Sequence, residues 1–251
     1  MPEGDKVLRE TRFLQKLLAG KHFIYISTCR DLSPTFDLGE LCSAADKPVH
    51  VFCKGKQFYF TFANEVTLMF HHMMGGYWSQ EETKHSILCM TFTDELKVYY
   101  NKQRFSKITF LADNVALQKS LRKITDGFIG DYLLDKETWL KKCKRFRADK
   151  SVRVTLLDQG ELCSGLGNYL VAEIMYFACI YPTAQFGDLN QDELINLYDV
   201  ALELVTDFYE QRIDQVIYKQ KVCPLGYPIR TLNVYNRTAH YVPEVQLIGV
   251  R

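Results

Sequence analysis

The sequence contains no run of about 18 apolar residues, the length that a membrane-spanning helix requires. Its first 20 residues are charged and amphipathic and lack the apolar centre of a secretory signal. Glycine and proline are scarce, with 14 and 7 residues among 251, which excludes collagen-like and low-complexity chains. Because 47% of the residues are hydrophobic, we expect a folded protein with no membrane contact and with one large domain or two smaller ones.

None of the eight cysteines stands in a C-x-x-C or C-x₄-C pair. Such pairs typically mark cysteine zinc sites, so we predict no bound metal. Without a secretory signal, the thiols are expected to be reduced in an intracellular compartment. The formal net charge is only +1, which excludes binding of a polyanion by bulk charge but leaves room for a local basic face.

Apolar residues at helical spacing predict a helix over residues 5–19, which Gly20 ends. Short runs rich in aromatic and β-branched residues follow, and turn residues separate most of them. The runs are 22–27, 49–62, 66–70, 87–92, 96–100 and 107–111. This pattern favours an antiparallel sandwich or barrel.

Helical periodicity returns at 114–124, 137–143, 151–158, 168–179 and 190–214, and a hairpin is expected from Ile229. Segregated strands and helices indicate an α+β protein. We predict an N-terminal β-sandwich at 1–125, a linker with a connecting helix at 126–150, a helical domain at 151–216 and a hairpin at 217–251.

Pro2 and Glu3 are the first candidates for chemistry. Removal of Met1 would expose a secondary amine, and a terminal amine is neutral at a lower pH than a lysine. A neutral amine attacks electrophilic carbon and forms an iminium, and an adjacent carboxyl group can act as a general acid. The alternative is that the Pro-Glu pair simply begins a helix.

A turn with Gly165 and Gly167 leads into the predicted helix at residue 168. Free backbone N–H groups at such a helix start would bind an anion, and Asn168 would add a neutral donor. Residues 141–153 nearby hold seven Lys or Arg against one Asp. Together these features favour a nucleic-acid phosphate, although a plain helix–turn–helix corner and a solvated helix face remain open.

Pro2-Glu3-Gly4 and the run from Leu156 to Pro182 together resemble the formamidopyrimidine-DNA glycosylase/endonuclease VIII family of base-excision repair enzymes. The resemblance covers nearly the whole chain. It implies that residues 151–216 form a helix–two-turn–helix domain, followed by a hairpin finger. It also implies a partner, damaged DNA that is single- or double-stranded, which we expect to be bound by a monomer.

The resemblance assigns roles to individual residues. Pro2 would attack the sugar carbon C1′, Glu3 would serve as general acid, and Lys56, at the start of a strand, would contact the site. Asn168 would hold a phosphate beside the lesion, and Arg237 would grip the phosphate of the flipped nucleotide. No cofactor is implied, because the chain terminus itself supplies the electron sink.

Two loop segments match the residues that fill the gap left by an extruded base. Met74 and Phe105 are present, and Arg104 is retained. Gln103 stands where the family has arginine, so we expect altered recognition of the opposite base. The DNA-binding set implied by the resemblance is therefore Met74, Gln103, Arg104, Phe105, Gly165, Gly167 and Asn168.

The hairpin departs from the family's usual zinc finger of four cysteines. Cys223 is retained, and Val242 and Val245 occur where the second cysteine pair is expected. The chain therefore resembles the zincless-finger members. Strand pairing and apolar contacts would have to replace the metal.

Only a few residues separate the end of the predicted helix 190–214 from the predicted hairpin region at Tyr218. Little room is left for the loop that covers 8-oxoguanine in the purine-acting branch of the family. The resemblance therefore favours oxidised pyrimidines and hydantoins, with β,δ-elimination. Two alternatives stay open: a damaged-DNA-binding module that has lost turnover, and an abasic-site lyase with little glycosylase activity. We expect a DNA-associated protein, in the nucleus of a eukaryote or in the cytoplasm and nucleoid otherwise.

Overall fold

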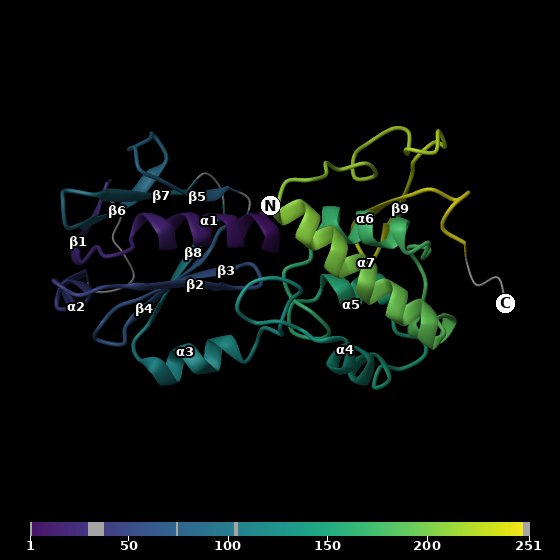
Figure 1. The fold of residues 1–251 in the computed structure, drawn as a ribbon, viewed down its shortest axis with the longest axis horizontal. Helices are drawn as coiled ribbons and strands as arrows, with labels where there is room; N and C mark the ends of the chain where they lie inside the picture. Colours follow the sequence, from purple (N-terminus) through teal and green to yellow (C-terminus); the bar gives the residue numbers. More distant parts are fainter. Residues whose placement is uncertain (1, 30–37, 74, 103–104, 248–251) are drawn as a thin grey trace. The chain divides into compact units, whose positions relative to one another are not determined.

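The computed structural model describes residues 2–29, 38–73, 75–102 and 105–247. The chain divides into two compact units (Figure 1). The first contains residues 1–2 and 6–123, and the second contains residues 3–5 and 124–251. Within the described ranges, no helix is long and apolar enough to cross a membrane.

The first unit contains two four-stranded antiparallel sheets. One has the order β1-β6-β7-β5 and the other the order β2-β3-β4-β8. The strands are β1 (Phe23–Thr28), β2 (His50–Lys54), β3 (Gln57–Thr61), β4 (Thr67–His71), β5 (Gly76–Ser79), β6 (Ser86–Phe92), β7 (Lys97–Lys102) and β8 (Lys107–Leu111). Three helices, α1 (Gly4–Leu17), α2 (Leu38–Cys42) and α3 (Asn114–Leu121), belong wholly or mostly to this unit.

Two strand predictions need correction. The run 49–62 forms two strands instead of one, because Gly55 at φ 58° turns the chain between β2 and β3. β5 was missed, since its four residues begin with Gly76 and offer no alternating pattern of useful length. The short helix α2 was missed for the same reason of length.

The interior of the first unit is rich in aromatic residues. Phe70 lies 4.9 Å from Trp78 and 4.7 Å from Tyr100, measured between ring centroids. Helix α1 packs Val7 and Leu14 into this unit, and both are nearly inaccessible to solvent. Burial of such side chains stabilises the unit by about 1.5–3 kcal/mol for each one.

The second unit is built from helices and one hairpin. Its elements are α4 (Lys136–Cys143), α5 (Val152–Leu157), α6 (Asn168–Phe177), the 3₁₀ turn η1 (Phe186–Asp188), α7 (Gln191–Tyr209), β9 (Arg230–Val234) and β10 (Arg237–Tyr241). Asp135, Ser151 and Asn190 begin α4, α5 and α7 by accepting a backbone N–H. Each cap satisfies a donor that the first helical turn leaves unpaired.

Helix α7 is shorter than predicted. It ends at Tyr209, because Gln211 takes a left-handed conformation with φ 59°. The N–H of Arg212 then donates to the carbonyl of Asp207 at 2.9 Å, which is the closing bond of a Schellman motif. The sequence has no glycine at this position to announce the end of the helix.

The core of the second unit surrounds Trp139, whose side chain is fully buried and donates from Nε1 to the carbonyl of Leu194 at 3.1 Å. Trp139 and Phe128 come from residues 126–150, the segment that we predicted as a linker with a connecting helix. The predicted α+β class is confirmed by the two antiparallel sheets and the helices that follow them.

Candidate functional site

Glu3 is buried, with 3% of its surface exposed, and its carboxylate lies at the start of α6. Its oxygens accept backbone N–H groups from Gly167 at 2.8 Å, Tyr169 at 3.1 Å and Leu170 at 3.2 Å. These donors are the N–H groups that a helix start leaves without partners, and the helix dipole favours a negative charge there. The half-buried Pro2 is therefore followed directly by a fixed carboxylate.

The glycines around Glu3 allow this close approach. A Cβ on Gly167 would stand 2.3 Å from Glu3 Oε1, and one on Gly4 would stand 2.8 Å from the Cα of Gly165. Gly4 N also donates to the carbonyl of Gly165 at 2.8 Å. Gly165 itself has φ 92°, which few residues other than glycine adopt.

The expectation of free amides at Gly165 and Gly167 was wrong. The Gly167 N–H donates to Glu3, and the Gly165 N–H donates to Gln159 Oε1 at 2.8 Å. The anion at this helix start is a carboxylate of the chain itself. Sequence spacing could not show this, because 164 residues separate Glu3 from Gly167.

Asp5 lies beside Glu3 and is also buried, with 1% of its surface exposed. Its carboxylate accepts a hydrogen bond from the hydroxyl of Tyr169. The first turn of α1 therefore contacts the first turn of α6 through two acidic side chains. The sequence analysis did not single out Asp5 or Tyr169.

Lys56 lies in the turn between β2 and β3 and is 93% buried, with 7% of its surface exposed. Gln57, the next residue, pairs with His71 at the end of β4, and His71 pairs with Lys107 at the start of β8. Burial lowers the pKa of His71, and the charges of Lys56 and Lys107 lower it further. One edge of this sheet therefore collects two lysines and a neutral histidine.

Two connections cross between the sheets at this same edge. Residues 72–75 lead from β4 to β5, and residues 103–106 lead from β7 to β8. The two connections start and end on paired strands. His71 at the end of β4 pairs with Lys107 at the start of β8, and Gly76 at the start of β5 pairs with Lys102 at the end of β7. The strand ends that flank the predicted gap-filling segments are thus neighbours, which their separation of about 30 residues does not indicate.

Phe105 is placed as an exposed aromatic residue, with 71% of its surface accessible and a left-handed φ of 51°. Exposed aromatic side chains in strained backbone are typical of binding positions. The predicted residues Met74, Gln103 and Arg104 lie outside the described residues.

Asn101 fixes the strand end that precedes this second connection. Its side chain is fully buried, donates to Ser79 Oγ at 2.8 Å and accepts from Ser86 Oγ at 2.8 Å. The sequence analysis did not recognise this role, although a polar residue in an apolar strand was the available signal.

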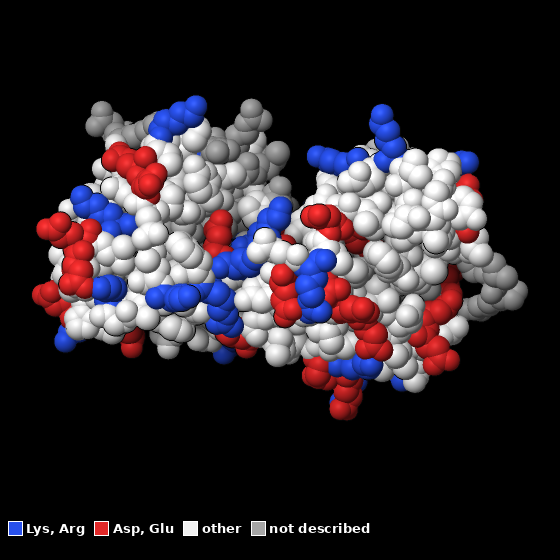
Figure 2. Space-filling view, turned by 45° about the horizontal axis from the view of Figure 1, so that its top comes forward, with Lys and Arg blue, Asp and Glu red and all other residues white. Residues whose placement is uncertain are grey.

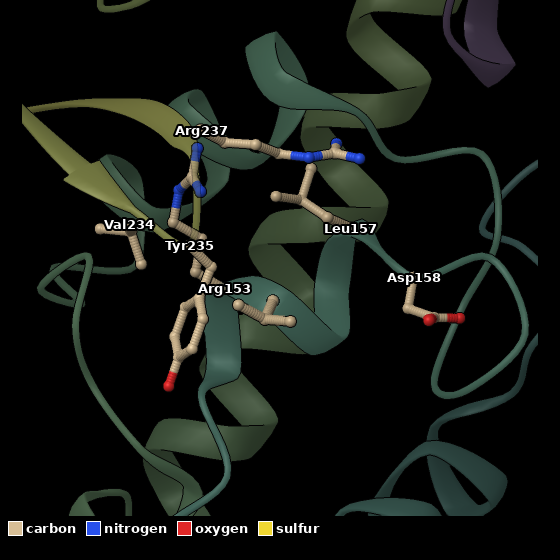
Figure 3. Close-up of a pocket in the computed structure, with 7 residues that line it drawn as sticks. Arg153, Leu157, Asp158, Val234, Tyr235 and Arg237 are labelled. Carbon is tan, nitrogen blue, oxygen red and sulfur yellow. The ribbon is translucent and has the colours of Figure 1, made fainter.

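In the second unit, polar and apolar side chains surround a small cavity of about 170 Å³ beside the hairpin (Figure 3). Arg153 of α5 and Arg237 of β10 both line it. Arg153 is 2% exposed, and its Nη2 donates to Asn168 Oδ1 at 3.3 Å and to the carbonyl of Thr238 at 3.1 Å. Arg153 therefore holds together α5, the start of α6 and the hairpin.

The pKa of Arg153 is lowered from 12.5 to about 10, mainly by burial and in smaller part by the charge of Arg237. Its Nη1 has no hydrogen-bond partner within the described ranges. Figure 3 shows the Arg237 side chain extending from the hairpin across α5 toward Leu157. Two guanidinium groups that repel one another beside a cavity favour an anionic ligand.

Arg153 is the functional candidate that the sequence analysis missed. It was counted in the basic run 141–153, for which a solvated helix face stayed open. Its spacing of three and four residues from Leu156 and Leu157 was the signal, because such positions share one helix face. Leu156 is fully buried, and Arg153 faces the interior with it.

The surface carries charges of both signs. In the view of Figure 2, Lys and Arg are interspersed with Asp and Glu and form no single broad basic area. Affinity for an anion would thus come from local groups such as Arg153 and Arg237.

The chain is similar to repair glycosylases along nearly its whole length. The family model described as formamidopyrimidine-DNA glycosylase N-terminal domain matches residues 1–108. Formamidopyrimidine-DNA glycosylase of Lactococcus lactis subsp. lactis (strain IL1403) is 24% identical over 257 residues, which cover 99% of this chain and 88% of that protein. Endonuclease 8 of Escherichia coli (strain 55989 / EAEC) is 25% identical over 221 residues, which cover 84% and 81%.

The fold is similar to that of solved structures as well. Wild-type Lactococcus lactis Fpg in complex with DNA containing an oxidised pyrimidine matches with a TM-score of 0.82 and 21% identity, covering 98% of this chain and 99% of that one. The chain is therefore similar in sequence to formamidopyrimidine-DNA glycosylases and to an endonuclease 8, and similar in fold to Fpg.

An apolar cluster lies at the base of the hairpin. It contains Ala172 and Tyr176 of α6 together with Ile217, Cys223 and Val242. Val245 packs against it, and Gln246 accepts the N–H of Val242 and donates to the carbonyl of Ile180. Within the part of the chain that the structure describes, no group of three or more His, Cys, Asp or Glu is placed to hold a metal.

Glu173 ties the chain that leads to the hairpin onto α6. Its buried carboxylate accepts the N–H groups of Val216, Ile217 and Tyr218 at 3.3, 3.1 and 2.9 Å. Burial raises the pKa of Glu173, while these three hydrogen bonds lower it in part. The hairpin that carries Arg237 thus starts from a fixed segment.

Proposed function

We propose that this protein is a bifunctional DNA glycosylase: it removes oxidised bases from DNA and then cleaves the strand at the abasic site, using the α-amine of Pro2 after removal of Met1. The observation that carries the proposal is the geometry of Glu3. A buried carboxylate held by three backbone N–H groups is fixed in position directly after the residue that carries the amine. A fixed acid beside an amine suits a reaction that joins nucleophilic attack to proton transfer.

The proposed reaction needs no cofactor, because the residues of the chain and water account for every bond and proton. The nitrogen lone pair of Pro2 forms a bond to C1′, and the base leaves with the electrons of the glycosidic bond and takes up a proton. Glu3 gives a proton to O4′ as the sugar ring opens, which leaves an iminium between C1′ and the proline nitrogen. The iminium makes the C2′ proton acidic, so the 3′ phosphate is eliminated, and the 5′ phosphate follows in a second elimination. Water then releases the sugar fragment and Pro2.

Binding of damaged DNA is supported by two groups of residues. Arg237 and Asn168 provide guanidinium and amide donors for phosphates, and Arg153 bonds both Asn168 and the carbonyl of Thr238, the residue after Arg237. Phe105, on the connection between β7 and β8, is the apolar group that would enter the gap left by an extruded nucleotide, together with Met74. Lys56, Gln103 and Arg104 complete the proposed contacts, with Gly165 and Gly167 shaping the turn under Glu3.

The proposed substrates are oxidised pyrimidines and hydantoins. Six residues, 210–215, separate the end of α7 from the segment that Glu173 holds. Although α7 ends earlier than predicted, this span is still short for a loop that encloses a large purine lesion. The E. coli relative is an endonuclease 8, and the matched Lactococcus structure contains an oxidised pyrimidine.

Borohydride trapping tests the proposal. The protein is mixed with duplex oligonucleotides that contain an abasic site, an oxidised pyrimidine or 8-oxoguanine, and sodium borohydride reduces the iminium to a stable covalent adduct. We expect adducts with the abasic site and the oxidised pyrimidine, and peptide mapping should place the adduct on Pro2. The absence of any adduct at neutral pH would overturn the lyase mechanism.

Glu3→Gln separates this mechanism from the alternatives. We expect it to bind DNA but to lose base removal. Equal and negligible cleavage by wild type and Glu3→Gln would instead favour a damage-binding module. Cleavage of abasic DNA alone would indicate a lyase with little glycosylase activity.

A further inference from the structure

Four polar side chains meet inside the first unit, where the proposed chemistry uses none of them. They are Glu10 of α1, His72 after β4, Tyr100 of β7 and Ser106 before β8, and we call them the buried polar cluster. His72, Tyr100 and Ser106 are 1%, 0% and 5% exposed. Glu10 Oε2, both His72 ring nitrogens, the Tyr100 hydroxyl and Ser106 Oγ are buried without a regular hydrogen bond to any described residue.

The members of the cluster are in mutual contact. His72 Nε2 lies 3.3 Å from Glu10 Oε2, and the His72 and Tyr100 rings are 5.6 Å apart between centroids. The Ser106 hydroxyl is close enough to Tyr100 to lower the pKa of the phenol, although burial has the larger effect and raises it. Their contacts with one another are therefore the main polar contacts of these five buried atoms. Buried polar atoms without a regular hydrogen bond are rare in native proteins, so five in one place call for an explanation.

The cluster also packs on the chain that begins β5. A Cβ on Gly76 would lie 2.3 Å from the Tyr100 hydroxyl and 2.9 Å from His72 Nδ1. Gly76 N donates to the His72 carbonyl at 2.8 Å, which closes the first connection. The position therefore admits only glycine while the cluster is in place.

These contacts place the cluster at the base of both sheet-crossing connections. His72 and Gly76 flank the first connection, and Ser106 directly follows the exposed Phe105 of the second. Both connections contain left-handed residues, Met73 at φ 46° and Phe105 at φ 51°. Strained backbone of this kind persists only where its surroundings hold it.

We propose that the buried polar cluster of Glu10, His72, Tyr100 and Ser106 is a set of positioning residues. It couples the chain after β4 to the chain before β8 and holds Phe105 where its side chain can fill the gap in damaged duplex DNA. This inference rests on the proposed function, because it assigns the two connections their gap-filling role. It predicts a specific defect. Loss of a cluster hydroxyl weakens insertion of the Phe105 side chain into a duplex. Binding of single-stranded DNA is unchanged, because a single strand has no opposite base and therefore no gap in a base stack of paired bases.

The test uses 2-aminopurine, whose fluorescence rises when it is unstacked, placed opposite a tetrahydrofuran abasic analogue. Binding is measured in the full-length Glu3→Gln protein, so that no cleavage intervenes. We expect Tyr100→Phe and Ser106→Ala to reduce the duplex fluorescence response about fivefold, while affinity for the single strand stays the same. Tyr99→Phe is the matched control, since Tyr99 neighbours Tyr100 on the opposite face of β7.

A response from Tyr100→Phe and Ser106→Ala equal to that of Tyr99→Phe would overturn the coupling role. So would an equal loss on single-stranded and duplex DNA, which indicates a general folding defect and would be visible in thermal melts. Failure of the proposed function is a separate result. If wild type forms no borohydride adduct while the fluorescence response still depends on Tyr100 and Ser106, the lyase mechanism falls and the positioning role stands.

Discussion

The carboxylate of Glu3 accepts a hydrogen bond from the backbone N–H of Gly167, 164 residues further along the chain. The side chain of Glu3 therefore accepts the unpaired N–H groups at the start of α6, a helix that lies far along the chain. The same contact fixes the acid that the proposed reaction uses, so the local structure of the site depends on tertiary packing.

Gly167→Ala is expected to displace Glu3, because the new Cβ would lie 2.3 Å from its Oε1. We expect base removal to fall by about 10²-fold, the usual contribution of a general acid. Gly226→Ala is the control for backbone strain alone, since its φ of 85° disfavours alanine but the added Cβ would meet no atom within 4 Å. Single-turnover cleavage of a lesion duplex measures both, and equal rates would contradict the role of Glu3.

Arg153→Lys should weaken DNA binding, because an ammonium cannot span both Asn168 Oδ1 and the carbonyl of Thr238. We expect about a tenfold loss of affinity at fixed salt, as for the loss of one oriented arginine. Arg230→Lys, an exposed position on the same hairpin, should change affinity little. Fluorescence anisotropy with both variants makes the comparison, and matching affinities would exclude an organising role for Arg153.

Phe105→Ala should leave stability within about 0.5 kcal/mol of wild type, because the side chain is 71% exposed. It should nevertheless slow excision from duplex DNA, since an apolar group is lost from the gap. Val115→Ala, with 77% exposure on α3, is the control for loss of an exposed apolar side chain. Denaturant titration and cleavage rates are measured on the same preparations, and normal excision by Phe105→Ala would argue against insertion.

The apolar cluster at the hairpin base should carry the stability that zinc provides elsewhere. Treatment with a strong chelator is expected to leave melting temperature and DNA binding unchanged. Val242→Ala should lower the free energy of unfolding by about 1–3 kcal/mol, because Val242 is fully buried. A drop in melting temperature with chelator that added zinc restores would show that a metal contributes.

Stability should fall between pH 6.5 and 8 because of Glu10. Burial raises the pKa of Glu10 from 4.5 to about 8, so the folded protein keeps a proton that the unfolded chain has lost, and stability declines as pH rises through that range. Burial and the nearby His71 lower the pKa of His72 from 6.5 to about 4, so His72 has the opposite effect between pH 4 and 6.5. Below pH 6.5 the two effects largely cancel.

Glu10→Gln is expected to reduce the decline between pH 6.5 and 8, as measured by urea unfolding at both pH values. An unchanged decline would show that Glu10 ionises normally in the folded protein.

The amino-acid sequence by itself determined which segments form helices or strands and which side chains could take part in a reaction. Helical and alternating periodicities identified most helices and strands, and short motifs together with the family resemblance led to the proposals for Pro2, Glu3 and Arg237. These features depend on neighbours within a few residues, which is the range over which spacing is informative. The same locality explains why the split of run 49–62 at Gly55 and the early end of α7 at Gln211 were missed.

Only the tertiary structure decided which of these residues meet. Glu3 reaches α6, Arg153 turns inward to join Asn168 to the hairpin, and the connections after β4 and β7 become neighbours through strand pairing. Each of these contacts joins residues that are far apart in the chain or on different elements. They follow from how sheets and helices bury their apolar faces, and no local pattern encodes that choice.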